Sequence, residues 1–110
     1  MKSIYRLKKN YQYNYVYKHA ESVADKEFVL LYCSSNGKQT KVGFSVSKKY
    51  GKAVHRNRIR RQLKAAVSNY MPNVKNGYNL IFIPRKSYEH LFSDVLNSVQ
   101  NLLSKANLLK

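Results

Sequence analysis

The chain has 110 residues, of which 21 are Lys or Arg and only five are Asp or Glu, so its formal net charge is +16. This length predicts one domain spanning residues 1–110, and an apolar content of 44% excludes a wholly disordered basic chain. No segment approaches the roughly 20 apolar residues of a membrane helix. Residues 1–10 are basic and lack the apolar run of a signal peptide. We therefore expect a cytoplasmic protein.

The positive charge is concentrated in the middle of the chain. No acidic residue occurs between Glu27 and Glu89, an interval that carries thirteen Lys and Arg. Like charges within one domain repel one another, and a polyanionic partner relieves that repulsion. Nucleic acid is the leading candidate, because phosphate neutralisation also releases condensed counterions. An anionic membrane surface fits less well, because the most basic segment lacks a broad apolar face.

The first predicted elements are an arm and a short helix. Residues 1–9 are expected to form a mobile basic arm that carries Lys2, Arg6, Lys8 and Lys9. Asn10 is the predicted N-cap of a helix that continues to about Ala20. Tyr13, Val16 and Tyr17 follow the three- and four-residue spacing that places side chains on one helix face.

The next segments predict a β-hairpin. Phe28–Cys33 is an apolar, β-favouring run, in which the lone Cys33 is expected to be a buried thiol. Asn36-Gly37 is a strong hairpin signal, so the strand predicted for Lys41–Ser47 is expected to pair with the first. Apolar and small side chains alternate along this second strand, giving one apolar face and one small, polar face. The small residues are Gly43, Ser45 and Ser47.

Two more helices and a strand complete the predicted order. A helix over about Val54–Tyr70 has an apolar stripe made of Ile59, Leu63, Ala66, Val67 and Tyr70. A strand is predicted for Tyr78–Ile83. The last helix is expected to begin at Ser87 and to point seven side chains inward: Leu91, Phe92, Val95, Leu96, Val99, Leu102 and Leu103. The order is αββαβα, an α+β fold with helices packed on the apolar face of a sheet.

The residues that could support catalysis are scattered. The acids Glu21, Asp25, Glu27, Glu89 and Asp94 lie outside the basic middle, so no carboxylate cluster for Mg²⁺ is predicted. The histidines, His19, His55 and His90, are each at or near a predicted helix end and are expected to be surface or cap residues. We expect neither catalytic nor metal-ligating residues in this chain.

The strongest local feature is the basic turn and helix from Lys48 to Lys64. Cations turn away from the apolar stripe, and no acid is available to pair with them, although solvated helix faces usually mix charge signs. Arginine forks suit phosphates and structured RNA. The sequence favours a binding surface, and a merely solvated helix face is the alternative.

A second candidate surface combines Tyr13 and Tyr17 with the small, polar strand face. Aromatic rings stack on unpaired bases of any sequence, at about 1–3 kcal/mol per base. An aromatic wall beside Ser45 and Ser47 would make a groove for single-stranded nucleic acid. Spacing alone leaves this interpretation and a buried-core role for the two tyrosines equally open.

These residues also carry a family resemblance. The run Ser45-Val46-Ser47-Lys48-Lys49, then Gly51, then Ala53-Val54-His55-Arg56-Asn57-Arg58-Ile59-Arg60-Arg61 resembles the signature of bacterial ribonuclease P proteins. The similarity extends through Arg6-Leu7-Lys8, Phe28-Val29-Leu30 and Arg85-Lys86, and so covers nearly the whole chain.

The resemblance implies a fold and a function. The fold would be a two-layer α/β sandwich with a left-handed β-α-β crossover, similar to domain 2 of ribosomal protein S5, although right-handed crossovers are the rule. The chain would be the non-catalytic protein subunit of a ribonucleoprotein that removes the 5′ leader of precursor tRNA. Its partners would be ribonuclease P RNA and precursor tRNA, with Mg²⁺ held by the catalytic RNA, and no membrane or obligate protein partner is expected.

The resemblance also assigns two sets of residues. The catalytic RNA would be contacted by Lys52, Arg56, Asn57, Arg58, Arg60, Arg61 and Lys64. The leader would be contacted by Tyr13, Tyr17, Ser45, Ser47, Lys48, Lys49 and Arg85. Tyr13 and Tyr17 stand where the family often has Phe, which keeps the ring and adds a hydroxyl. A structural RNA-binding protein of ribosomal type, and a DNA- or membrane-binding module, are the alternatives.

Overall fold

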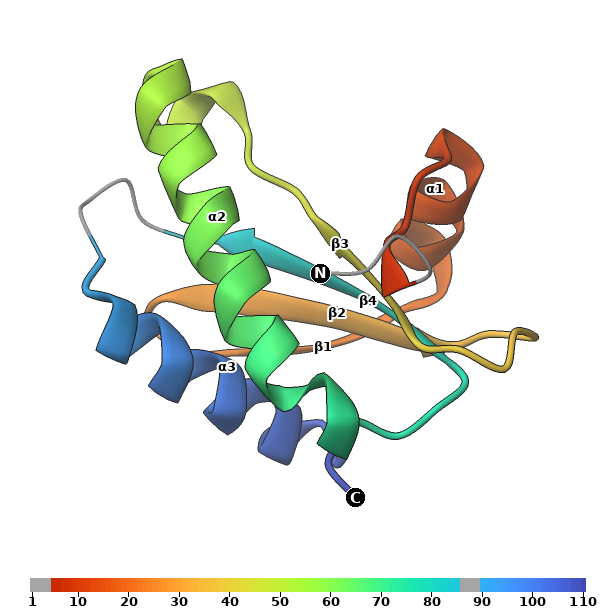
Figure 1. Cartoon of the computed structure of the whole chain (residues 1–110). Coiled ribbons are helices and arrows are strands. Elements are labelled where there is room, and N and C mark those ends of the chain that lie inside the picture. The colour runs from red at the N-terminus through yellow and green to blue at the C-terminus, as the bar shows by residue number, and fades with distance from the viewer. Residues whose placement is uncertain (1–4, 86–89) are drawn as a thin grey trace.

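A computed structural model of the chain describes residues 5–85 and 90–110 (Figure 1). In chain order, the elements are α1 (Asn10–His19), β1 (Glu21–Ala24), β2 (Phe28–Ser34), β3 (Lys41–Phe44), the 3-10 turn η2 (Lys48–Tyr50), α2 (Ala53–Tyr70), the 3-10 turn η3 (Met71–Asn73), β4 (Tyr78–Pro84) and α3 (Phe92–Lys105). This mixture of helices with a four-stranded sheet confirms the α+β class. The short strand β1 was missing from the predicted order.

The strand order in the sheet is β1-β2-β4-β3. β2 is antiparallel to both β1 and β4, with Leu30 opposite Phe82, and β3 is parallel to β4, with Val42 opposite Leu80. The predicted hairpin between β2 and β3 is therefore wrong, because β4 lies between these strands. The segment with Asn36-Gly37 instead carries the chain past β4 to the far edge of the sheet.

The connection β3–α2–β4 joins two parallel neighbours. In Figure 1, α2 lies in front of the sheet, both strands run towards the left, and β4 lies below β3. This arrangement is left-handed, since a right-handed connection would place β4 on the other side of β3. The unusual crossover that the family resemblance implies is present.

The main core lies between one face of the sheet and the helices α2 and α3. Phe28, Leu30, Val42, Leu80 and Phe82 of the strands are buried against the two helices. The predicted stripe of α2 is confirmed: Ile59, Leu63, Ala66 and Val67 are buried, and Tyr70 packs on the core as a partly buried residue.

The last helix begins later than predicted. Val95, Val99, Leu102 and Leu103 are buried as expected, and Leu96 packs against the same core. Leu91 and Phe92 are wrongly predicted to point inward, since they are 70% and 42% exposed. The cause is that Leu91 is the extended N-cap of α3, so the helical spacing does not reach it. The predicted start at Ser87 lies outside the described residues.

A smaller core forms on the opposite face of the sheet. α1 packs on this face, and not beside α2 and α3 as predicted. Val16 and Leu7 are buried there with Ile81 of β4. The N–H of Leu7 donates to the carbonyl of Val42 at 3.0 Å, and Arg6 forms a parallel bridge with Val42. The expected mobile arm is therefore wrong for residues 6 and 7.

The start of α1 also differs from its prediction by one residue. Asn10 is the first helical residue, and Lys9 is the N-cap. The side-chain oxygen of Gln12 accepts hydrogen bonds from the backbone N–H groups of Lys8 and Lys9, each at 3.1 Å. The glutamine thus satisfies donors that a helix start otherwise leaves free.

Candidate functional site

The Tyr13 side chain of α1 reaches over β3 at Gly43, a residue that has no side chain. A Cβ atom at Gly43 would lie 2.6 Å from the hydroxyl oxygen of Tyr13. The Tyr13 hydroxyl makes a hydrogen bond with the backbone of Phe44. Burial raises the pKa of the Tyr13 hydroxyl, against smaller lowering contributions from that bond and from Arg6 and Arg60. The half-buried Tyr13 ring thus packs on the small, polar face of β3. Together with Tyr17 it forms a surface that we call the aromatic wall.

Tyr17 continues this wall into solvent. Its hydroxyl donates a hydrogen bond to Oγ of Ser45 at 3.0 Å, and its side chain is 48% exposed. The Tyr13 and Tyr17 rings are 6.5 Å apart and tilted by 42°. Tyr17 is therefore not a core residue, and the structure brings Tyr13, Tyr17 and Ser45 together as the groove interpretation requires.

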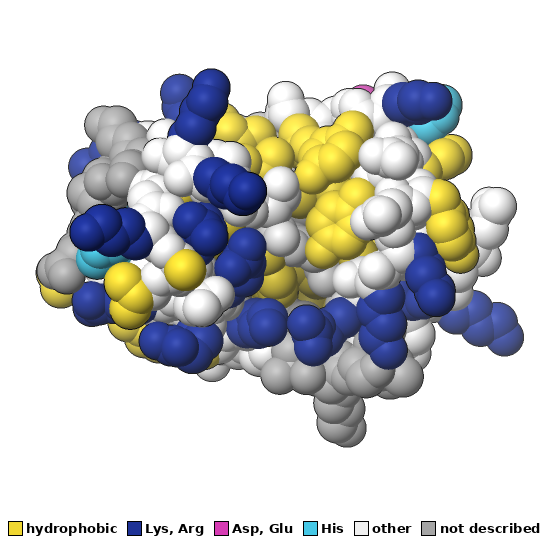
Figure 2. Space-filling model, turned by 90° about the horizontal axis from the view of Figure 1, so that it is seen from above, with side chains coloured by type: hydrophobic (Ala, Val, Ile, Leu, Met, Phe, Trp, Pro, Cys, Tyr) yellow, Lys and Arg dark blue, Asp and Glu magenta, His cyan; other side chains and the backbone are white. Residues whose placement is uncertain are grey.

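Cations border this aromatic wall. Burial lowers the pKa of the Lys64 ammonium group, and the nearby charges of Arg6 and Arg60 lower it further. Since Arg6 and Arg60 also act on Tyr13, the arginine-rich helix and the aromatic wall adjoin each other. Seen from above in Figure 2, hydrophobic side chains gather over the middle of this face, and Lys and Arg side chains follow one border and cluster at one end.

Arg6 is a site residue that the sequence argument did not select. It was assigned to the arm, and its bridge to Val42 brings it beside Lys64 and Arg60 instead. The only sequence signal was its place in the Arg6-Leu7-Lys8 run of the family resemblance.

Hydrogen bonds to uncharged groups orient two of the arginines of α2. Nη1 of Arg56 donates to the carbonyl of Gly51 at 2.6 Å, and Nη1 of Arg60 donates to Oδ1 of Asn57 at 3.1 Å. Both acceptors are uncharged, so these bonds orient the guanidinium groups without neutralising them. The other predicted residues of this set lie on the same helix or just before it: Lys52, Arg58 and Arg61 are exposed and Lys64 is partly buried.

The remaining predicted groove residues fall into two groups. Ser47, Lys48 and Lys49 are exposed and follow Ser45 directly along the chain into η2. Arg85 is exposed at the end of β4, but its Nη1 donates to the carbonyl of Asp25 at 2.7 Å, in the turn between β1 and β2. Its backbone N–H also donates to the carbonyl of Glu27, so these bonds connect Arg85 to that turn and not to Tyr17. Lys86 lies outside the described residues.

Cys33, which was predicted to be a buried thiol, is only partly buried. It packs beside the smaller core that Leu7, Val16 and Ile81 form. Burial raises the pKa of its thiol, which disfavours the reactive thiolate.

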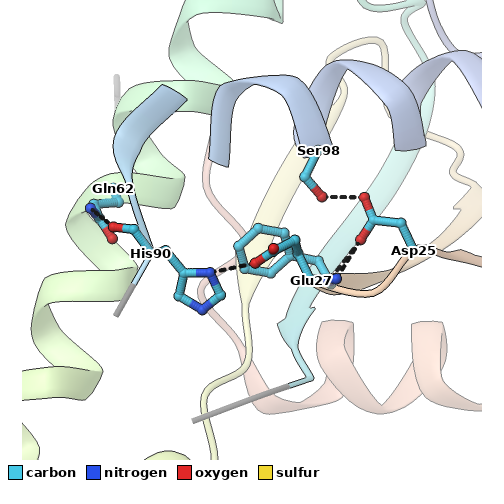
Figure 3. A network of polar contacts seen from close by, with 6 residues as sticks. Asp25, Glu27, Gln62, His90 and Ser98 are labelled. Carbon is cyan, nitrogen blue, oxygen red and sulfur yellow. Dashed lines mark hydrogen bonds and ion pairs between the residues drawn. The ribbon is translucent and has the colours of Figure 1, made fainter. Parts of the chain in front are cut away.

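His90 is buried, so the prediction that it is a surface or cap residue is wrong. Its Nδ1 lies 2.6 Å from Oε2 of Glu27, and its ring stacks on Phe28 and Tyr50 with centroids 5.3 and 6.3 Å away (Figure 3). Gln62 of α2 donates to the His90 carbonyl at 3.0 Å. His19 and His55 are exposed.

The same network fixes the turn before β2. Oδ1 of Asp25 accepts the N–H groups of Glu27 and Phe28 at 2.8 and 2.9 Å, and Ser98 of α3 donates its hydroxyl to the other carboxylate oxygen (Figure 3). Asp25, Glu27 and His90 thus join the β1–β2 turn to α2 and α3. No sequence signal distinguished this pair of Glu27 and His90, because the residues lie far apart in the chain.

Two other kinds of site are absent from the described residues. In this part of the chain, no group of three or more His, Cys, Asp or Glu side chains could hold a metal ion. Nor does any helix between residues 5 and 85 or 90 and 110 combine the length and apolar content needed to cross a membrane.

Taken together, the left-handed crossover, the cationic helix and the aromatic wall define a small basic α+β protein whose surface suits a polyanion. The chain matches the family model described as Ribonuclease P over residues 1–107, and it belongs to this family of ribonuclease P proteins. The family resemblance of the sequence is confirmed.

Curated relatives agree over almost their whole length. The chain is 43% identical over 111 residues to the ribonuclease P protein component of Clostridium kluyveri, with 97% of this chain and 98% of the relative covered. It is 39% identical over 104 residues to that of Clostridioides difficile, with 93% and 91% covered.

Solved structures agree with the fold. The RNase P protein of Staphylococcus aureus superposes with a TM-score of 0.87 at 30% identity, covering 96% of this chain and 98% of the other. The RNase P protein of Thermotoga maritima superposes with a TM-score of 0.82 at 25% identity, covering 91% and 96%.

Proposed function

We propose that this chain is the protein subunit of a tRNA 5′-maturation ribonucleoprotein, in which it binds ribonuclease P RNA and the 5′ leader of precursor tRNA. The observation that carries the proposal is the hydrogen bond from the exposed Tyr17 to Ser45. The aromatic wall to which Tyr17 belongs adjoins the cations of α2. Family membership favours this function over that of a structural ribosomal-type protein.

Each surface has its own task in this proposal. The cationic surface of α2 contacts phosphates of the folded RNA, since guanidinium forks fit phosphate oxygens. Its residues are Lys52, Arg56, Asn57, Arg58, Arg60, Arg61 and Lys64. Tyr13 and Tyr17 stack on unpaired leader bases, while Ser45, Ser47, Lys48 and Lys49 contact the leader backbone. Arg85 would contact the leader only after leaving the Asp25 carbonyl.

The chemistry belongs to the RNA in this proposal. Mg²⁺ held by the RNA subunit supports hydrolysis of the phosphodiester bond, which leaves a 5′-phosphate on the mature tRNA. The protein reduces repulsion between two large polyanions and adds binding energy for the leader. Because mature tRNA has no leader, this energy favours substrate over product. The assembly works in the cytoplasm and needs no further protein.

Reconstitution with a ribonuclease P RNA at low Mg²⁺ tests the proposal. The chain is expected to restore cleavage of precursor tRNA, to bind precursor more tightly than mature tRNA, and to cleave nothing without the RNA. Cleavage by the protein alone, or equal affinity for the two tRNAs, would contradict it.

A further inference from the structure

We propose that a second groove, on the opposite flank of α1 from Tyr13 and Tyr17, also binds unpaired nucleotides of RNA. The proposal rests on the proposed function in one respect, namely that RNA is the partner. Its centre is the pair Tyr11 and Tyr15, which none of the assignments above uses.

The geometry of α1 separates the two aromatic pairs. Val16 is buried against the sheet, and Tyr13 leans over Gly43. At 3.6 residues per turn, Tyr11 and Tyr15 share one side of the helix, roughly half a turn from Tyr13 and Tyr17. The helix therefore carries an aromatic pair on each flank of its buried line.

Tyr11 and Tyr15 form one wall of a groove of about 580 Å³. The rest of its lining comes from α1, the end of β2, the segment that follows it, the start of β3, and β4: Gln12, Ser34, Ser35, Asn36, Gly37, Gln39, Lys41 and Asn79. The two rings are 70% and 51% exposed, although burying rings of this size is normally favourable. The centroids of the Tyr15 and His19 rings are 4.3 Å apart.

The lining has the chemistry of a nucleotide site. Rings supply stacking surfaces that accept any base. Side-chain amides such as Gln39 and Asn79 offer both donors and acceptors to base edges and ribose hydroxyls. Lys41 provides a cation for a phosphate, and exposed Lys38 lies between the lining residues Gly37 and Gln39.

The charge of the groove lining and of the whole chain favours a polyanionic ligand. None of the ten lining residues is acidic, and the chain carries a net charge of +16. A polyanion is therefore attracted to the groove. Exposed rings without a hydrophobic surround favour flat, stackable groups, which points to single-stranded RNA. We assign the occupant to a further segment of the leader, because the leader is the unpaired strand that the proposed function places along Tyr13 and Tyr17 of the same helix.

A fluorescent substitution tests occupancy directly. The chain has no Trp, so Tyr15→Trp introduces a single indole at the groove. Titration with a single-stranded oligoadenylate is expected to quench this indole by stacking. Asn14→Trp, on an exposed position of the same helix, is the matched control and is expected to be quenched much less. Equal quenching of the two variants would overturn the proposal.

Binding measurements identify the source of the RNA. Tyr11→Ala/Tyr15→Ala is expected to weaken binding by about fivefold or more for each ring, the change that about 1 kcal/mol of stacking produces. A loss with ribonuclease P RNA alone would overturn the assignment to the leader. A loss only with precursor tRNA bound to the assembled ribonucleoprotein assigns it to the leader. Tyr11→Phe/Tyr15→Phe is expected to retain binding, because the rings remain.

Failure of this inference is distinguishable from failure of the proposed function. If the unmodified chain binds both RNAs and the double alanine variant binds them equally well, only the second groove is refuted. If the unmodified chain does not rescue the RNA at low Mg²⁺, the proposed function itself fails. Asn14→Ala serves as the control for helix stability and is expected to bind like the unmodified chain.

Discussion

The ring of Tyr13 rests directly on the backbone of Gly43. A methyl group on Gly43 would lie 2.6 Å from the Tyr13 hydroxyl oxygen and 2.7 Å from the ring carbon Cζ. The missing side chain therefore leaves the space that the Tyr13 ring occupies over β3.

Gly43→Ala is expected to push Tyr13 out of its place and to weaken precursor tRNA binding. Overpacking at such a contact typically destabilises a protein by about 1–3 kcal/mol. Gly37→Ala is the matched control for stability, because a Cβ there would meet ordinary contacts at 3.7 and 3.8 Å. Urea unfolding and a binding titration measure both effects. If the two alanine variants are equally stable and Gly43→Ala binds precursor tRNA like the unmodified chain, Tyr13 does not need this contact.

Tyr17→Ala is expected to weaken binding of precursor tRNA more than binding of mature tRNA. The lost stacking corresponds to about 1–3 kcal/mol, or roughly five- to 150-fold in the dissociation constant. Tyr17→Phe keeps the ring and removes only the hydrogen bond to Ser45, so it should lose much less. An equal loss for both tRNAs would remove Tyr17 from the leader site.

Arg61→Ala is expected to flatten the salt dependence of binding to ribonuclease P RNA. Each lost phosphate contact lowers the slope of log affinity against log salt by about one. Lys26→Ala is the control, since it removes the same charge from the exposed turn between β1 and β2. Affinities measured over a range of salt concentrations give the slopes. An unchanged slope for Arg61→Ala would mean that this side chain only solvates the helix.

Lys64→Gln is expected to stabilise the free protein while weakening RNA binding. Folding lowers the pKa of Lys64 below its ordinary value of 10.5, chiefly through burial and then through Arg6 and Arg60. The protonated lysine therefore opposes folding at neutral pH, and this penalty disappears as the pH rises from the folded pKa towards 10.5.

Thermal melts at neutral and high pH test this sign for Lys64. The gain in melting temperature for Lys64→Gln should be largest at neutral pH and low salt, and smaller in high salt, which screens Arg6 and Arg60. A lower melting temperature for the variant at neutral pH would contradict the prediction.

His90→Ala is expected to destabilise the fold by about 3 kcal/mol or more, because it leaves the buried carboxylate of Glu27 without its partner. Two stacked rings, Phe28 and Tyr50, also lose a neighbour. His55→Ala, at an exposed position, should change stability by less than about 0.5 kcal/mol. Urea unfolding midpoints of the two variants measure this difference. Equal midpoints would mean that the contact between Glu27 and His90 does not stabilise the fold.

The helices and strands with strong local patterns could be predicted from the sequence. The buried stripe of α2, the alternation along β3 and the apolar runs of β2 and β4 follow from the local sequence alone. The pairing of the strands does not, because Asn36-Gly37 reports only a local turn, while β2 pairs with β4 through partners about fifty residues away. β1 was missed because only Val23 of its four residues packs on the core.

Part of the candidate site was also visible in the sequence. The cations of α2 stand out because no acid accompanies them, and the exposure of Tyr17 settles a question that spacing left open. The buried role of His90 and the position of Arg6 depend on residues that meet only after folding. The groove at Tyr11 and Tyr15 has the same origin, since its other wall comes from the segment after β2.

The pairing of residues 6 and 7 with Val42 has a consequence for solubility. β3 is an outer strand, and unpaired N–H and C=O groups on such a strand are a template for adding a strand of another molecule. The chain's own Arg6 and Leu7 occupy that template at Val42. This pairing is expected to protect the protein from aggregating through the β3 edge at high concentration. A truncation that removes these two residues would leave backbone groups of β3 free to pair with another molecule.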